Sequence, residues 1–256
     1  MIVELFGPPG SGKTTFADAL TARLRESRLA VELKLSWRPA ELPPVLAAGG
    51  KAGGRYQNAV VHRIARPVRE MLTIARHPLA NSRDISTAVR LVRRLPPRGI
   101  VLSIKNTQYL SRLSHAWYEE ENASHIAVFD QAFVQAVCSL ALVAGVTGDV
   151  IIAEALGCVP RSDLFVRLEA PLELLKARLY DRWRLQSTVE RLLEADLMRS
   201  LASLSMIDRL QGILLKQGWP VLRASSLDRE SLQKSVDFVA NEIIAKRRAE
   251  RLGTSS

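Results

Sequence analysis

Short apolar segments alternate with helical patterns along most of the chain. Five segments have the length and composition of buried strands: residues 2–6, 31–36, 126–129, 164–168 and 220–223. Other stretches place apolar residues at the spacing of amphipathic helices: residues 14–25, 131–144, 171–183, 188–217 and 230–251. Strands that alternate with helices are typical of a parallel sheet covered by helices on both faces. The pattern therefore predicts a three-layer α/β fold around a five-stranded sheet.

The interval between the second and third predicted strands is about ninety residues, too long for a bare loop. Helical patterns occupy residues 58–74, 82–94 and 100–119, and the Pro96-Pro97 pair with Gly99 separates the last two. We therefore expect one domain over residues 1–256 with a helical insertion at residues 38–120.

The residues that follow the first predicted strand match the phosphate-binding pattern G-x-x-x-x-G-K-[ST]. They are Gly7, Pro8, Pro9, Gly10, Ser11, Gly12, Lys13 and Thr14, with Thr15 next in the predicted helix. A strand before this pattern and a helix after it are the context in which it binds nucleotide. Backbone amides and the helix N-terminus cradle the phosphates, the lysine reaches the β- and γ-phosphates, and the hydroxyl of Thr14 is a ligand for Mg²⁺. The pattern predicts a nucleotide site, against the alternative of a chance Gly/Pro-rich turn.

Asp130 directly follows the third predicted strand, Ile-Ala-Val-Phe. An acid at this edge of a parallel sheet is placed to hold Mg²⁺ or to act as a base on an acceptor hydroxyl. The alternative is that Asp130 caps the helix expected at residues 131–144.

Arg178 and Arg182 lie four residues apart in the predicted helix after the fourth strand, so they share one helix face. Two guanidinium groups there are candidates for neutralising phosphate charge during transfer. A solvated helix face is the alternative interpretation.

The net charge of +10 is concentrated in one part of the chain, because residues 51–98 carry eleven bases and two acids. Such a block points to an anion: an acidic acceptor molecule or, less favoured because Tyr56 is its only aromatic residue, nucleic acid. The alternative, that these residues form a solvated helix face and bind no anion, has equal weight. The sequence has no apolar run of about 18 residues and no signal-peptide pattern at its start, so we expect a cytoplasmic protein with no membrane partner.

The P-loop, the acid after the third strand and the basic helix after the fourth strand, in this order, resemble the nucleoside and nucleotide kinases, a group that includes adenylate and thymidylate kinases. The resemblance implies the sheet order 2-3-1-4-5, an acceptor side at residues 38–120 and a lid-like segment at residues 178–190. Arg38 lies near the place of an Arg-Glu-Pro stretch in thymidylate kinases, and Arg66 and Arg69 of the basic block are further candidate acceptor ligands. The chain departs from thymidylate kinases at Pro9, where they carry an acid, and at Gln131, where they carry arginine.

We therefore expect an enzyme that uses ATP and Mg²⁺ to phosphorylate a small, anionic acceptor: a nucleotide, a nucleoside or a similar metabolite. Catalysis would come from positioning and charge neutralisation, since phosphoryl transfer needs little covalent help. The alternatives are a non-catalytic nucleotide-binding regulator or slow NTPase switch and, less favoured, a nucleic-acid-binding P-loop protein. A homodimer is a further expectation about partners.

Overall fold

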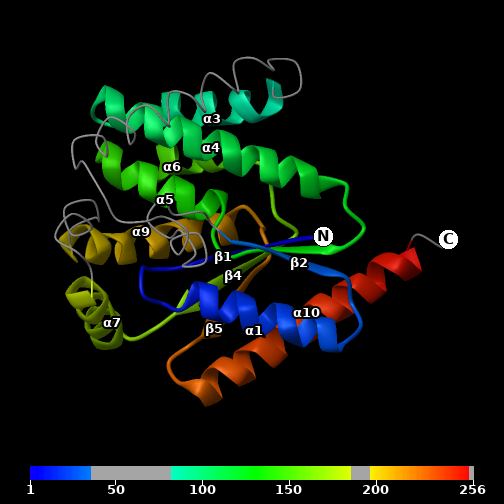
Figure 1. Cartoon of the computed structure of the whole chain (residues 1–256). Coiled ribbons are helices and arrows are strands. Elements are labelled where there is room, and N and C mark those ends of the chain that lie inside the picture. The colour runs from blue at the N-terminus through cyan, green and yellow to red at the C-terminus, as the bar shows by residue number, and fades with distance from the viewer. Residues whose placement is uncertain (36–81, 186–196, 254–256) are drawn as a thin grey trace, which may run out of the picture.

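A computed structural model describes residues 1–35, 82–185 and 197–253 of the chain (Figure 1). Parallel strands form a five-stranded sheet in the order β2-β3-β1-β4-β5. The strands are β1 (Ile2–Phe6), β2 (Val31–Lys34), β3 (Ile126–Phe129), β4 (Leu164–Glu169) and β5 (Val221–Ser225). The predicted fold class, strands and strand order are confirmed, with strand ends that shift by one or two residues.

The described helices follow the predicted pattern closely. They are α1 (Lys13–Glu26), α3 (Ser82–Arg94), α4 (Ile100–Glu121), α5 (Phe133–Ala144), α6 (Asp149–Leu156), α7 (Leu172–Leu185), α9 (Leu197–Lys216) and α10 (Arg229–Gly253). Helix α6 was not predicted from the sequence, because it has only eight residues and its sequence, DVIIAEAL, has few polar residues to give an amphipathic pattern. The helix predicted at residues 58–74 lies outside the described residues. Among the described helices, none combines the length and the apolar character that crossing a bilayer requires.

The side-chain alternation of β1 divides the interior into two cores, one on each face of the sheet. Ile2 and Phe6 pack with the cluster formed by α3, α4, α5, α6 and α9. Val3 and Leu5 pack with the cluster formed by α1 and α10. Figure 1 shows the resulting layers, with α1 and α10 below the sheet and α3, α4, α5 and α6 above it. Burial on both faces explains why β1, β3 and β4 are nearly continuous apolar runs in the sequence.

The sheet order brings the ends of two particular strands together. β1 lies between β3 and β4, and Glu4 is paired with Phe129 in the parallel register of β1 and β3. The loop that follows β1 and the residue that follows β3 therefore emerge side by side at the carboxyl edge of the sheet, the edge where parallel α/β sheets bind ligands.

Candidate functional site

The loop between β1 and α1 has the backbone features of an anion cradle. Gly12 is the N-cap of α1 with a φ of 83°, in the left-handed region that glycine adopts without strain. The cap makes no side-chain hydrogen bond, and the first turn of α1 holds no acid. The N–H groups at this helix end are therefore not neutralised locally and favour an anion. At Gly7, a Cβ atom would lie 2.6 Å from the backbone oxygen of Leu168, so only glycine permits the close approach of this loop to β4.

The Lys13 side chain lies along the same loop. Its Nζ donates to the backbone oxygens of Gly7, at 2.8 Å, and Pro8, at 3.0 Å. Lys13 is only 7% exposed, yet it lines the cavity described below. The structure therefore keeps a positive charge at the cavity wall, where a phosphate oxygen can form a charge-assisted hydrogen bond.

Thr14 and Asp130, the two predicted metal ligands, are in direct contact. Thr14 lies in the first turn of α1, and its Oγ1 donates to Asp130 Oδ2 at 3.0 Å. Asp130, which follows β3, is 2% exposed. Residues 116 positions apart thus place a hydroxyl oxygen and a carboxylate oxygen together beside the phosphate cradle.

The capping role considered for Asp130 is wrong. Helix α5 begins at Phe133, two residues later than predicted, and its N-cap is Ala132, which makes no side-chain hydrogen bond. The backbone N–H of Asp130 instead donates to the backbone oxygen of Lys34 in β2 at 3.2 Å.

Glu4, in the middle of β1, is a buried acid that the sequence analysis did not single out. It is fully buried, and its Oε1 accepts a hydrogen bond from the backbone N–H of Val134 at 2.6 Å. Its Oε2 accepts one from Ser162 Oγ at 3.0 Å. Burial raises the pKa of Glu4 to about 8, and these hydrogen bonds oppose the rise. The signal in the sequence was a single acid inside an otherwise apolar strand.

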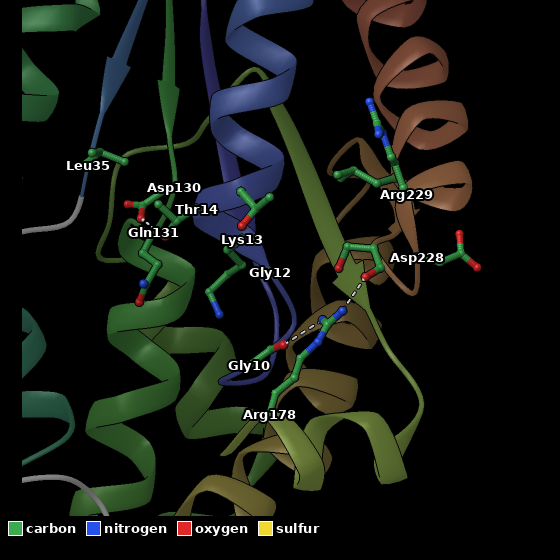
Figure 2. Close-up of a pocket in the computed structure, with 13 residues that line it drawn as sticks. Gly10, Gly12, Lys13, Thr14, Leu35, Asp130, Gln131, Arg178, Asp228 and Arg229 are labelled. Atoms are coloured by element: carbon green, nitrogen blue, oxygen red, sulfur yellow. Dashed lines mark hydrogen bonds between the residues drawn. The ribbon is translucent and has the colours of Figure 1, made fainter. Parts of the chain in front are cut away.

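Arg178 of α7 joins two loops at the opposite side of the cradle. Its guanidinium donates to the backbone oxygen of Gly10 at 3.1 Å and to those of Ser226 and Leu227 at 2.9 and 3.3 Å. Ser226 in turn donates from its Oγ to the backbone oxygen of Ser11. Arg178 therefore links the P-loop to the segment between β5 and α10, as the dashed lines in Figure 2 show in part.

Several predicted site residues cannot be placed. The backbone of Arg182 belongs to α7, but its side chain lies outside the described part of the structure. Arg38, Arg66 and Arg69 also lie outside it. Their roles remain predictions.

These parts surround one open cavity of about 660 Å³, a size typical of small-molecule sites. Figure 2 shows the lining side chains, with Asp130 and Gln131 on one side of the cradle and Arg178, Asp228 and Arg229 on the other. The full lining is Gly10, Gly12, Lys13, Thr14, Thr15, Leu35, Asp130, Gln131, Arg178, Ser226, Asp228, Arg229 and Leu232. Part of the predicted P-loop thus meets Asp130 and Arg178 at this cavity, and the segment between β5 and α10 adds residues that had no sequence signature.

A second group of ionisable side chains lies at β2 and the ends of α4 and β3. Lys34 Nζ contacts Glu32 and Glu120 at 2.6 and 2.8 Å, and His125 Nε2 contacts the same two carboxylates at 3.3 and 2.5 Å. The two glutamates and His125 have the ligand types of a metal site. Because Lys34 already bridges both carboxylates, the arrangement is that of an ion-pair network that ties α4 to the edge of the sheet.

No family model matches the sequence, and no curated protein matches it. Three solved structures of deoxyadenosine kinase from M. mycoides have a backbone path similar to that of this chain. The structure with bound dCTP covers 96% of this chain and 100% of the kinase, with 10% identity and a TM-score of 0.44. The structure with the products dCMP and dCDP covers 96% and 100%, with 11% identity and a TM-score of 0.45. The structure with dATP covers 95% and 99%, with 12% identity and a TM-score of 0.48. At these values the likeness assigns neither a substrate nor an activity to this chain.

Proposed function

We propose that this chain binds ATP with Mg²⁺ and transfers the terminal phosphoryl group to a small acceptor. The observation that carries the proposal is the contact of Thr14 with Asp130, 3.0 Å long, at the wall of a cavity that Lys13 also lines. A hydroxyl and a carboxylate beside a lysine-bearing anion cradle are the parts that phosphoryl transfer from a nucleoside triphosphate uses.

The residues present fit a magnesium ion. Mg²⁺ prefers oxygen ligands, and Thr14 Oγ1 and Asp130 Oδ2 are such ligands, brought together from two neighbouring strand ends. When bound, Mg²⁺ neutralises phosphate charge.

The chain's own residues would bind and orient the phosphates. The amides at the N-terminus of α1 and the ammonium of Lys13 supply the positive ends of the hydrogen bonds. Arg178 would hold Gly10 and Ser226 in place, so that both loops keep their positions when a nucleotide enters. Arg182, one helical turn further along α7, is proposed to contribute charge to the same region, as the sequence predicts.

We propose that the acceptor enters from the side of Leu35 and Gln131. Leu35 lines the cavity and lies three residues before the predicted acceptor segment at residues 38–120. A nucleotide, a nucleoside or another small metabolite is compatible with this entry. Arg38, Arg66 and Arg69 remain the proposed ligands of an anionic acceptor.

The test is the formation of ADP from ATP with and without a panel of nucleosides, nucleotides and other small hydroxyl compounds. Acceptor-dependent ADP formation supports the proposal. Slow, acceptor-independent hydrolysis contradicts transfer and favours a nucleotide switch, and stimulation by DNA or RNA favours a nucleic-acid role.

A matched pair of variants makes the test specific to the cradle. Lys13→Ala should abolish turnover. Lys176→Ala removes another lysine, one that pairs with Glu173 on the surface of α7 at 3.0 Å, and should leave turnover unchanged.

A further inference from the structure

The strand that leads into the P-loop carries a carboxyl group where its neighbours are apolar. Ile2 and Phe6 belong to the core cluster on the α5 side of the sheet, and Glu4 lies between them with no solvent exposure. An acid at such a position is unfavourable unless hydrogen bonds satisfy it. The contacts of Glu4 therefore indicate what it does.

The main partner of Glu4 is the N-terminus of α5. Helix α5 lacks a cap of its own, because its N-cap is Ala132 and its first turn holds no acid. Glu4 Oε1 accepts from the N–H of Val134, in that first turn, at 2.6 Å. A residue of β1, 130 positions away in sequence, thus performs the capping that a Ser, Thr, Asp or Asn would perform locally.

A second bond ties the same helical turn to the P-loop. Gln135 Oε1 accepts a hydrogen bond from the backbone N–H of Gly7 at 3.3 Å. The first turn of α5 is therefore bonded both to β1 and to the loop that follows β1.

Asp130 lies between two anchors. The first is the hydrogen bond that its backbone N–H donates to the backbone oxygen of Lys34 in β2. The second is α5, which begins at Phe133, three residues after Asp130. The position of the first turn of α5 therefore limits where the carboxylate of Asp130 can point. That carboxylate accepts a hydrogen bond from Thr14 Oγ1, in the first turn of α1.

We infer that Glu4 is a positioning residue: it holds the N-terminus of α5 at the P-loop so that Asp130 faces Thr14. The inference rests on the proposed function, because Asp130 and Thr14 are the proposed magnesium ligands. Supporting groups of this kind change the metal affinity of their ligands by about 10- to 100-fold when they are removed. A residue of purely structural importance would instead change thermal stability alone.

In the experiment, Mg²⁺ is added to the protein in the presence of a fluorescent ATP analogue, and the Mg²⁺ concentration at half-maximal signal change is the Mg²⁺ midpoint. The affinity for the analogue without metal is measured separately in EDTA. Glu4→Ala should raise the Mg²⁺ midpoint by about tenfold and leave the metal-free affinity for the analogue within about twofold. Glu4→Gln should restore the midpoint, because its amide oxygen can accept from Val134 while its NH₂ group donates to Ser162. If Glu4→Ala does not fold, Ser162→Ala, which removes one partner of Glu4, should raise the midpoint by a smaller factor.

Two controls separate the possible outcomes. Val239→Ala opens a cavity in the core on the other face of the sheet, so it should lower the melting temperature without moving the Mg²⁺ midpoint. Asp130→Asn tests the proposed metal site itself. If Asp130→Asn raises the midpoint while Glu4→Ala and Ser162→Ala, measured wherever they fold, do not, the positioning role of Glu4 is overturned and the proposed function stands. If Asp130→Asn has no effect, the proposed metal site fails, and the role of Glu4 fails with it.

Discussion

Glu4 should make the free energy of unfolding depend on pH in a way that one substitution removes. Burial raises the pKa of this carboxyl from 4.5 to about 8, and the hydrogen bonds from Val134 and Ser162 only reduce the rise. In the unfolded chain the carboxyl titrates near its ordinary value. The folded state therefore keeps a proton that the unfolded state releases. The stabilisation is complete below the unfolded pKa and is lost as the pH rises through the folded value of about 8.

The expected size follows from proton linkage. When only the folded state binds a proton, the free energy of unfolding falls by about 1.4 kcal/mol for each unit by which the pH rises. Between about pH 5.5 and pH 7.5 the loss is therefore up to roughly 3 kcal/mol. This is a large share of the roughly 5–15 kcal/mol that stabilises a typical domain, so urea denaturation can resolve it.

The assay compares the wild-type chain with Glu4→Gln across this pH range. Hydrogen bonds lower the pKa values of Asp228 and Asp237, and Lys34 lowers that of Glu32, so these groups lose their stabilising contribution only on the acid side of the window. We expect the stability of the wild type relative to the variant to fall by about 2–3 kcal/mol as the pH rises. Parallel curves would refute the assignment of a buried, proton-binding carboxyl.

Four further outcomes are expected. Lys13→Ala should reduce ATP turnover by at least about 100-fold with a similar melting temperature, since it removes a cation from the phosphate cradle, and a loss within a few-fold contradicts that role. Asp130→Asn should raise the Mg²⁺ requirement by about tenfold or more without destabilising α5, whereas a large drop in melting temperature would show that Asp130 is needed for stability. Arg178→Ala should weaken binding of a fluorescent ATP analogue, and Arg178→Lys should fail to restore it because lysine cannot bridge the two loops, so full recovery would argue against the bridge. The double change Arg66→Gln and Arg69→Gln should raise the Michaelis constant of an anionic acceptor more than that of ATP, and unchanged constants would remove both arginines from the acceptor site.

Strands β1, β3 and β4 could be predicted because each is a short, mostly apolar run buried on both faces of the sheet, and such runs are visible without any knowledge of the tertiary structure. The edge strands β2 and β5 are more exposed, and their signal is weaker. The P-loop could be predicted because its residues are contiguous in the sequence and the chemistry of phosphate binding requires each residue type at its position. The pairing of Thr14 with Asp130 followed from topology, since adjacent parallel strands end at the same edge.

The remaining features depend on contacts between distant residues. The capping of α5 by Glu4 spans 130 positions, and nothing local at Ala132 indicates that the helix is capped from another strand. The role of Arg178 was predicted as charge neutralisation, but its hydrogen bonds to backbone oxygens of two loops carry no sequence pattern. The segment at Ser226 and Asp228 has no motif either, and only the fold brings it to the cavity.

Most of these predictions depend on the claim that this chain transfers the γ-phosphoryl group of ATP to a small acceptor through the site at Lys13, Thr14 and Asp130. The most direct measurement follows ATP labelled on its γ-phosphate with radioactive phosphorus through incubation with Mg²⁺ and the acceptor panel. We expect the label to appear on one class of acceptor and to disappear from that product in Lys13→Ala. Label found only in inorganic phosphate, or retained entirely in ATP across the whole panel, would contradict the claim.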